Sequence, residues 1–240
     1  MARHSASLLG SGSTRKVHSG AFRIHPGWER ECGAEGYQCV AGVDEAGRGC
    51  LFGPVVAAAV VLGDPHGLRG VNDSKQLTET ERESLFEQIT RHALWWSTGV
   101  VDAATIDRIN ILEASRVAMR MAVEALGAHA DYLLVDAMRV DLPLPQQAII
   151  HGDALCRSIA AASIVAKVTR DRNMREWERI YPGYGLASNK GYGTAVHLSA
   201  LHERGATPEH RYSFRPVREA CQALTSLEWT LLSERQLKLF

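Results

Sequence analysis

The sequence predicts an α/β domain in which helices pack on a mixed sheet. Short apolar runs typical of strands alternate with segments of helical periodicity, and no internal repeat interrupts this order. The 240 residues, 45% hydrophobic and 22% charged, suit one globular domain with an extension and argue against wholesale disorder. The longest apolar run, 55–62, is far shorter than the roughly 18 residues of a membrane helix, so an integral membrane protein is excluded.

The first half of the chain contains three predicted strands and two predicted helices. Residues 40–46 and 53–62 have strand character, and Arg48 between two glycines indicates a hairpin-like connection. Thr78 with Glu81 three residues later is a capping box that begins a helix reaching about residue 92. Residues 95–101 suit a returning strand, and 106–126 repeat apolar residues at helical spacing.

The second half adds two short strands and further helices. Residues 132–136 predict a short buried strand that ends at Asp136, and residues 147–150 predict another. A long helix is expected from 154 to about 180, where Pro182 and Gly183 stop it. Residues 194–204 and 218–232 are expected to be helices as well.

The N-terminal segment and the cysteines indicate the cellular compartment. Residues 1–26 contain four Lys/Arg, no Asp or Glu, and no apolar core like that of a secretory signal. We interpret them as a disordered basic tail; an organellar transit peptide is the alternative. Five cysteines without a CxxC pair favour reduced thiols, and we expect a cytoplasmic protein.

The formal net charge of zero conceals an asymmetry along the chain. Residues 27–166 hold 11 Lys/Arg against 19 Asp/Glu, whereas residues 167–218 hold 10 against 5. This division suggests an acidic part that could hold cations and a basic part that could hold a polyanion. Helices with charged solvent faces would produce the same numbers, so the interpretation depends on motifs.

Four acids lie at the ends of predicted elements: Asp44, Glu45, Asp136 and Asp153. Carboxylates crowded at one sheet edge repel each other, and a hard divalent cation removes that penalty. Oxygen-only ligation favours Mg²⁺ or Mn²⁺, and two such ions can activate water for phosphodiester hydrolysis. Taken singly, each acid is explained as a cap or a surface charge, and Asp153 as a helix N-cap.

The turn Gly47-Arg48-Gly49 offers unobstructed backbone N–H groups that suit a phosphate or a sugar hydroxyl. A tight turn with one exposed Arg is the simpler interpretation. The sequence contains no GxxxxGK[ST], which disfavours a nucleoside triphosphatase, and no GxSxG, so no Ser-His-Asp hydrolase is indicated.

Several blocks together resemble the ribonuclease HII family. They follow the family's order from about residue 40 to 217, which makes a chance match implausible. The blocks are Gly42-Val43-Asp44-Glu45-Ala46-Gly47-Arg48-Gly49, Asn72-Asp73-Ser74-Lys75-Gln76-Leu77, Val135-Asp136, Gly152-Asp153, 159–171, Lys190-Gly191-Tyr192 and His197.

The resemblance implies a ribonuclease H-like fold with a C-terminal helical segment, and cleavage of RNA in RNA–DNA duplexes with Mn²⁺ or Mg²⁺. It implies that the four acids are metal ligands and catalytic residues. Gly47, Arg48 and Gly49 would contact the ribose 2′-hydroxyl beside the scissile phosphate, and Tyr192 would stack on the neighbouring deoxyribose. A 2′-hydroxyl is what distinguishes RNA from DNA, so this assignment has a physical basis.

Further residues are predicted to hold backbone phosphates. Asn72, Ser74 and Lys75 precede the capping box, and a loop before a helix is the simpler interpretation. Lys167 and Arg170 are one helical turn apart, and both could face a duplex phosphate, although solvated helix charges explain them equally well.

Two positions depart from the family pattern. His151 replaces the usual Lys before Gly152-Asp153, and Cys156 replaces a common Ser. A histidine is only partly charged near neutral pH, which puts any phosphate contact made by that Lys in doubt.

The predicted organisation is an extension over 1–39, a catalytic domain over 40–217 and a C-terminal helix or tail over 218–240. The extension is too short for the extra domain of the related ribonuclease HIII. We expect a monomer without membrane contact that acts on RNA–DNA hybrids and incises ribonucleotide-containing duplex DNA. The alternatives are a catalytically silent hybrid-binding module, which the intact acids argue against, and a DNA strand-transfer or resolvase enzyme, which has no reason to read a 2′-hydroxyl.

Overall fold

The computed structural model describes residues 27–63 and 77–223. A five-stranded sheet in the order β3-β2-β1-β4-β5 forms its centre. The strands are β1 (Val40–Ala46), β2 (Val55–Leu62), β3 (Ala93–Val101), β4 (Tyr132–Asp136) and β5 (Gln146–Ile149). β1 pairs antiparallel with β2 and parallel with β4, β2 pairs antiparallel with β3, and β4 pairs parallel with β5. The predicted α/β class with a mixed sheet is therefore confirmed.

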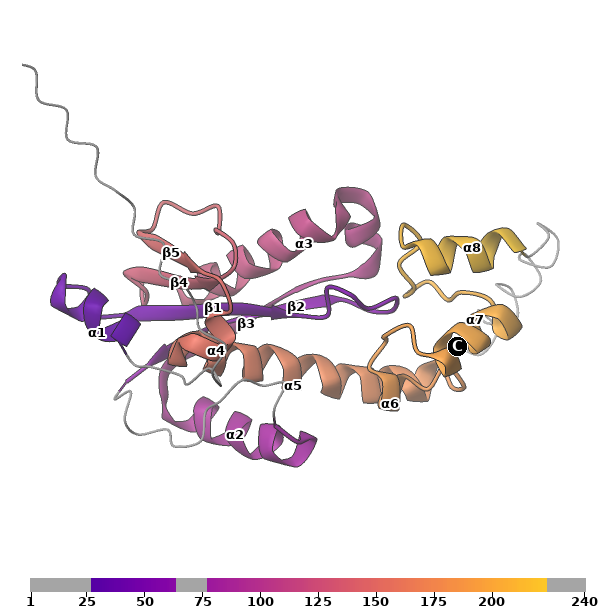
Figure 1. Cartoon of the computed structure of the whole chain (residues 1–240), viewed down its shortest axis with the longest axis horizontal. Helices are drawn as coiled ribbons and strands as arrows, with labels where there is room; N and C mark the ends of the chain where they lie inside the picture. The colour runs from indigo at the N-terminus through magenta and orange to yellow at the C-terminus, as the bar shows by residue number, and fades with distance from the viewer. Residues whose placement is uncertain (1–26, 64–76, 224–240) are drawn as a thin grey trace, which may run out of the picture.

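Helices cover both faces of the sheet (Figure 1). On one face lies α3 (Ala103–Leu126), and on the other lie α5 (Arg157–Ile180) and, packed against it, α2 (Glu79–His92). The remaining helices are α1 (Gly27–Ala34), α4 (Gly152–Leu155), α6 (Leu186–Asn189), α7 (Ala195–Arg204) and α8 (Arg215–Ala223).

The sequence of β2 explains why the sheet is buried on both faces. Along this apolar run, Val55, Ala57, Ala59 and Val61 belong to the core under α3, while Ala58 and Val60 belong to the core under α5. Side chains alternate between the faces of a strand, so an uninterrupted apolar run fits a central strand covered on both sides. On β1, Gly42 allows α5 to approach, because a Cβ there would lie 2.0 Å from the Ser158 carbonyl carbon.

The helix expected over 154–180 is interrupted. Cys156 has extended φ/ψ angles of −118° and 130° and separates α4 from α5. The backbone N–H of Cys156 closes α4 on the Gly152 carbonyl, and the Cys156 carbonyl accepts the Ala160 N–H at the start of α5. Glu29 of α1 accepts the Ser158 N–H at 2.8 Å and thereby satisfies one donor of the new helix start.

α3 is also not continuous. Asn110 has a φ of 67°, and its side-chain oxygen accepts the N–H groups of Leu112 and Glu113 at 2.9 and 3.1 Å. An asparagine in this conformation ends one helical segment and caps the next, which propensity along 106–126 does not reveal. The capping box at Thr78 and Glu81 is confirmed.

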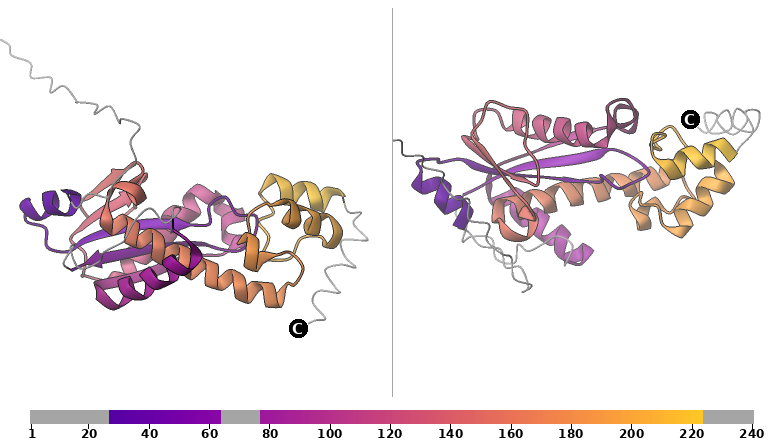
Figure 2. Two further views of the ribbon diagram at one scale, coloured as in Figure 1. Left: turned by 60° about the horizontal axis from the view of Figure 1, so that its bottom comes forward. Right: turned by 45° about the horizontal axis from the view of Figure 1, so that its top comes forward.

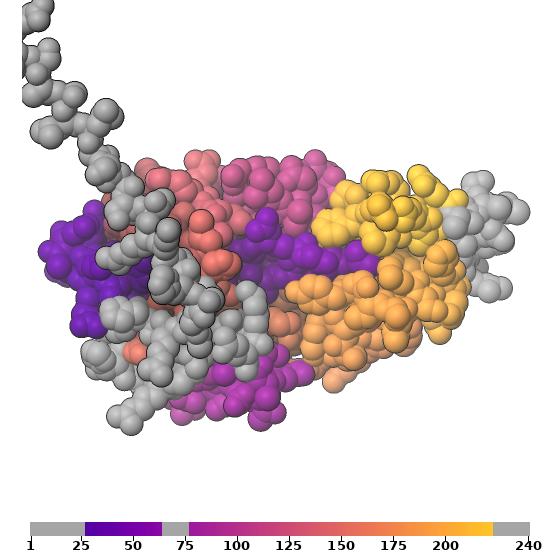
Figure 3. Space-filling model, in the orientation of Figure 1, coloured from indigo at the N-terminus to yellow at the C-terminus, as the bar shows by residue number. Residues whose placement is uncertain are grey.

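The C-terminal helices α6, α7 and α8 share one hydrophobic cluster with the end of α5 and with the connection between β1 and β2. Both views of Figure 2 place these helices at one end of the molecule. The space-filling view shows the same orange and yellow segment against the indigo β1–β2 region (Figure 3). α8 begins at Arg215, three positions earlier than expected, and spans the predicted boundary at 217; residues 224–240 lie outside the described residues.

The N-terminal extension contributes to the fold. α1 lies within residues 1–39, and its Cys32 is buried with Leu134, Ile149 and Ile159. The tail over 1–26 lies outside the described residues. No helix in the described part of the chain is long and apolar enough to cross a membrane.

Candidate active site

Three neighbouring parallel strands place the acids at one sheet edge. Val43 of β1 is paired with Val135 of β4, so the next residues, Asp44 and Asp136, end adjacent strands. Asp136 is paired in turn with Ile149, the last residue of β5, and Asp153 follows four residues later on α4. The carboxyl ends of parallel strands meet at one edge, which is where ligands bind in open α/β sheets.

The carboxylates are held by hydrogen bonds from the backbone. Asp44 Oδ1 accepts the Glu45 N–H at 2.7 Å, and Asp136 Oδ1 accepts the Gly152 N–H at 2.7 Å. Asp44 and Asp153 are each only 5% exposed. The Gly152 contact joins the end of β4 to the start of α4 and so fixes two of the acids relative to each other.

Burial and mutual repulsion disfavour the charged forms of these acids. The pKa of Asp44 is raised well above its usual value by burial, then by the negative charges of Glu45 and Asp136. Burial also raises the pKa of Glu45, against the lowering effect of Arg48, whose Nη1 lies 3.3 Å from Glu45 Oε1. Glu45 Oε2 is buried and has no hydrogen-bond partner among the described residues. The site therefore holds more negative charge than the protein compensates.

The turn after β1 needs glycine at its first position. Gly47 has a φ of +97°, and a Cβ there would lie 2.1 Å from Nε of Arg170. Arg170 cannot move aside cheaply because it donates hydrogen bonds to the carbonyls of Pro54, Lys190 and Phe52 at 2.7–3.0 Å.

These contacts overturn the prediction that Arg170 faces a duplex phosphate. Arg170 is 1% exposed, and its guanidinium lies beneath the turn. One helical turn away, Lys167 retains 25% side-chain exposure and pairs with Asp171 at 2.6 Å. Residues three apart on a helix are close, but with 3.6 residues per turn they point about 60° apart around the axis, so one can be buried while the other is partly exposed.

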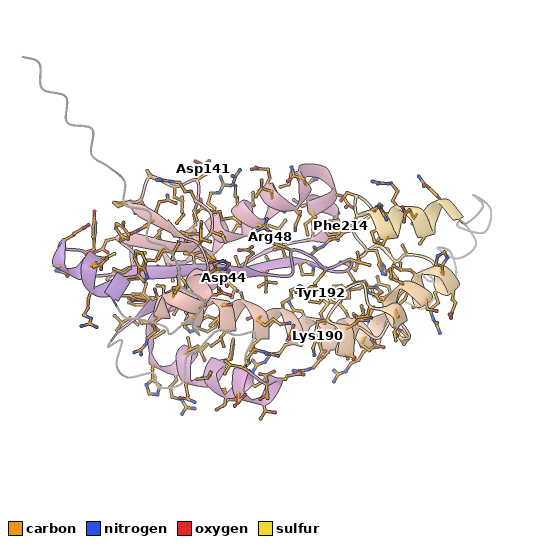
Figure 4. The ribbon with its side chains drawn as sticks, in the orientation of Figure 1. Asp44, Arg48, Asp141, Lys190, Tyr192 and Phe214 are labelled. Carbon is orange, nitrogen blue, oxygen red and sulfur yellow. The ribbon has the colours of Figure 1, made fainter. Side chains whose placement is uncertain are left out.

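A cavity of about 290 Å³ joins most of the predicted residues. Asp44 and Arg48 lie near the middle of the molecule, and Tyr192 lies on the side of the C-terminal helices (Figure 4). The cavity is lined by Asp44, Glu45, Ala46, Gly47, Arg48, Gly49, Arg82, Asp136, Asp153, Ser163, Lys167 and Tyr192.

Tyr192 is placed by a tight turn between α6 and α7. Its N–H donates to the Asn189 carbonyl at 3.0 Å, and its own carbonyl accepts the Thr194 N–H at 2.8 Å. The side chain is 43% exposed, and a Cβ on Gly49 would lie 3.8 Å from Cε1 of the Tyr192 ring. The aromatic face thus lies beside the glycine turn, although the two are far apart in sequence.

Two cavity residues were not identified from the sequence. Ser163 forms a side-chain hydrogen bond with Asp44, and it lies one helical turn before Lys167 on the same face of α5. Arg82 lies on α2, and its Nη1 donates to the Leu77 carbonyl. The i, i+4 spacing of Ser163 and Lys167 was a usable signal, whereas Arg82 resembles an ordinary charged helix residue.

Other predicted residues lie elsewhere. Asn72, Ser74 and Lys75 lie outside the described residues. His151 is exposed with a φ of 58° and precedes α4, and it does not line the cavity. Cys156 is fully buried, and its Sγ lies 3.2 Å from Glu29 Oε1.

Within residues 27–63 and 77–223, no group of three or more His, Cys, Asp or Glu side chains already has the arrangement of a metal site. Asp44 and Asp136 each turn one oxygen toward a backbone N–H. The four acids line one cavity without converging on a single point.

The comparisons with known proteins agree with one another over most of the chain. A sequence model of the family described as Ribonuclease HII matches residues 41–217. A ribonuclease HII of Solibacter usitatus is 51% identical over 92% of this chain and 94% of its own. One from Geobacillus kaustophilus is 56% identical over 83% of this chain and 77% of its own. The crystal structure of ribonuclease H2 from Pyrococcus horikoshii superposes with a TM-score of 0.66 at 29% identity, covering 78% of this chain and 98% of that one.

Proposed function

The chain belongs to the ribonuclease HII family of metal-dependent endoribonucleases that cleave the RNA strand of RNA–DNA hybrids, and from this premise we propose that it also incises duplex DNA at single embedded ribonucleotides. The observation that carries the proposal is the composition of one cavity, which combines the four acids, the glycine turn and Tyr192. This set suits a substrate with one reactive phosphodiester next to one 2′-hydroxyl.

The acids have the chemistry of a site for hard divalent cations. All the donors are carboxylate oxygens, Glu45 Oε2 is buried without a partner among the described residues, and burial followed by like charges raises the pKa of Asp44. We propose that Asp44, Glu45, Asp136 and Asp153 hold Mn²⁺ or Mg²⁺ after small side-chain rotations. A bound pair of such ions would supply an activated water and would stabilise the leaving oxygen of a phosphodiester.

The remaining cavity residues orient the substrate. Backbone groups of Gly47, Arg48 and Gly49 bind the 2′-hydroxyl, and the flat ring of Tyr192 stacks on a deoxyribose that follows it. An additional 2′-hydroxyl at that second sugar would meet the ring face, so the preferred cut lies on the 5′ side of a ribonucleotide followed by deoxyribose. Cleavage there leaves a 3′-hydroxyl and a 5′-phosphate.

Two positively charged side chains at the cavity, Lys167 and Arg82, are suited to contact phosphates of the duplex. Lys167 Nζ has three donors, of which the pair with Asp171 uses one, and Arg82 approaches from α2. Phosphate contacts position a duplex without reading its sequence. We therefore propose that Lys167 and Arg82 set the position of the duplex in the site and add to the affinity for it.

The chain is proposed to act as a cytoplasmic monomer. The lining of the cavity comes from one copy of the chain, and all five cysteines are free thiols, as expected in a reducing compartment. Light scattering of the purified chain with and without duplex tests this state, and a constant dimer mass contradicts it.

The decisive experiment compares three duplexes that carry one ribonucleotide, an all-RNA strand opposite DNA, or no ribonucleotide. Wild type should cut the first two, and Asp44→Asn and Asp136→Asn should reduce turnover by about 10³-fold or more while binding persists. Asp153→Asn should lose less, because a carboxamide keeps one oxygen ligand. Wild-type turnover in the first two variants contradicts the metal site.

The same assay separates the alternatives. Binding of the hybrid without cutting identifies a silent binding module, and cutting or joining of the all-DNA duplex identifies a strand-transfer or resolvase enzyme. Tyr192→Ala should slow the single-ribonucleotide duplex about tenfold or more, while Tyr192→Phe keeps most of the rate, because stacking is worth about 1–3 kcal/mol. Equal slowing on both ribonucleotide substrates makes Tyr192 a packing residue.

A further inference from the structure

Four polar side chains outside the cavity are completely buried beside it. His197, Thr207, His210 and Arg211 are each 0% exposed. They lie in or after α7, and none of them can reach solvent to bind substrate directly. Buried polar groups whose hydrogen bonds are satisfied make the structure around them rigid, so their partners indicate what they hold in place.

The two histidines form a chain whose proton positions are determined by geometry. His197 Nδ1 lies 2.9 Å from the Tyr192 carbonyl oxygen, which can only accept, so Nδ1 carries the proton. His197 Nε2 is then the acceptor for His210 Nε2–H, 3.1 Å away. His210 Nδ1 accepts in turn from the backbone N–H and the hydroxyl of Thr207, both at 2.9 Å. Two neutral rings satisfy every position in this chain.

The next residue holds the glycine turn. Arg211 donates from Nη1 to the Arg48 carbonyl at 3.0 Å and from Nε to the Gly53 carbonyl at 2.9 Å. The backbone N–H of Arg211 donates to the Leu51 carbonyl. The backbone N–H of Leu51 donates in turn to the carbonyl of Gly191, the residue before Tyr192. Arg211 Nη2 has no hydrogen-bond partner among the described residues. A buried cation with an unsatisfied donor costs stability, so what Arg211 contributes is the geometry that its other donors fix.

We propose that His210 and Arg211 are positioning residues that set the distance between the Gly47-Arg48-Gly49 turn and Tyr192, and with it the preference for an RNA–DNA junction. His210 holds the Tyr192 backbone through His197, and Arg211 holds the turn through Arg48. The inference rests on the proposed roles of the turn and Tyr192. Two adjacent sugars on one strand must contact the turn and Tyr192 at the same time, so the distance between these two elements is fixed by the substrate. A displacement near 1 Å therefore lowers the rate strongly.

The test uses variants of both positioning residues and a matched control. Arg211→Lys keeps the charge but loses the planar fork to two carbonyls, and His210→Gln removes the ring that holds His197. Asp107→Asn is the control, because Asp107 accepts from the N–H groups of Tyr212 and Ser213 at 2.8 and 2.9 Å and tethers the same segment without touching either reader.

The measurement is kcat and KM on the single-ribonucleotide duplex and on the all-RNA hybrid, together with Tm. Arg211→Lys and His210→Gln should each lower the ratio of kcat/KM values, junction over hybrid, by roughly tenfold, mainly through kcat. Asp107→Asn should change Tm but leave the ratio within about twofold. An unchanged ratio in both positioning variants, or an equal loss in the control, overturns the inference. If wild type shows no junction preference, the proposed function fails instead.

A second measurement does not depend on activity or on variants that fold. ¹⁵N spectra of the histidine rings in wild type at neutral pH should show His197 protonated at Nδ1 and His210 protonated at Nε2, with both ring protons protected from exchange. A His197 ring protonated at Nε2, or a fast-exchanging pair, shows that the histidines do not hold the Tyr192 carbonyl and overturns the inference.

Discussion

Buried polar groups are arranged in opposite ways on the two sides of the cavity. At the sheet edge, burial and then the charges of Glu45 and Asp136 raise the pKa of Asp44, burial and the charge of Asp136 raise that of Glu45, and one carboxylate oxygen has no partner in the described chain. Beside Tyr192, the buried histidines are neutral and fully hydrogen-bonded. The first region keeps an unfavourable charge that a ligand can relieve, and the second uses hydrogen bonds to fix distances.

Apart from loss of the acids themselves, the largest expected effect comes from a substitution in the turn that lies between these two regions. Gly47→Ala should lower kcat/KM by about 100-fold or more, because the new Cβ meets the immobilised Arg170 and the positive φ is unfavourable for Ala. Gly36→Ala is the matched control, with a φ of +101° but no atom within 4 Å of the added Cβ. If both variants keep wild-type activity on the single-ribonucleotide duplex, the turn tolerates displacement. The difference between the acidic side and the histidine side would then have no effect on activity.

The histidine side should lose stability in acid. Burial, and then the charge of His197, lower the pKa of His210 to about 3, whereas an unfolded histidine titrates near 6.5. Below about pH 6.5, His210 takes up a proton in the unfolded chain but stays neutral in the folded chain. Its contribution to stability is therefore complete above pH 6.5 and is lost progressively toward pH 3, by up to about 2 kcal/mol at pH 5.

Urea unfolding in EDTA at pH 7 and pH 5 measures this loss. His210→Gln should lose less than wild type over the same interval, since the variant has no ring to protonate at that position. Equal losses in the two proteins would show that His210 titrates normally in the folded chain.

The acidic side should respond in the opposite direction. The raised pKa of Asp44 means that its charge costs stability at neutral pH and that the cost disappears as pH falls through the folded pKa and below about 3.8. Asp44→Asn should therefore stabilise the metal-free protein at pH 7 by about 1–2 kcal/mol, with roughly 2–4 °C of Tm for each kcal/mol.

Thermal unfolding with EDTA and with Mg²⁺ shows whether Asp44→Asn raises or lowers the stability of the protein. Mg²⁺ should raise the Tm of wild type more than that of Asp44→Asn, because only wild type retains the full set of ligands. A lower Tm for the metal-free variant would mean that Asp44 is a structural hydrogen-bond acceptor and not an uncompensated charge.

The smallest effect concerns the start of α5, where Glu29 accepts the Ser158 N–H. Glu29→Ala should lower stability by about 1 kcal/mol, because the Ser158 N–H at the start of α5 loses its acceptor. Glu31→Ala on the exposed side of α1 is the control and should change little. Denaturant midpoints measure both, and equal losses would mean that α1 contributes only general packing.

Much of the fold was predictable because local signals and burial agree. The apolar run of β2, the capping box at Thr78 and the strand ending at Asp136 each match the structure within a few residues. The breaks at Asn110 and Cys156 were not predicted, because each depends on backbone conformation. Helical periodicity continues through both positions and hides the interruption.

The site was predictable where chain order and family resemblance coincide. Asp44, Asp136 and Tyr192 line one cavity, but the sequence did not reveal that Arg170 is buried under the turn. Its partners are three backbone carbonyls, and backbone acceptors leave no signature in residue types. For the same reason the roles of His210 and Arg211 follow only from the structure.

The contacts of Arg211 also determine when each property of the protein arises during synthesis. Arg211 reaches carbonyls 158 and 163 positions earlier in the chain, whereas all four acids precede it by more than 50 residues. Nascent chains fold from the N-terminus, and contacts of such long range form last. If His210 and Arg211 have the proposed positioning role, a chain that stops before residue 207 would carry all four acids but lack the contacts that hold the turn and Tyr192, so junction selectivity would require synthesis through Arg211.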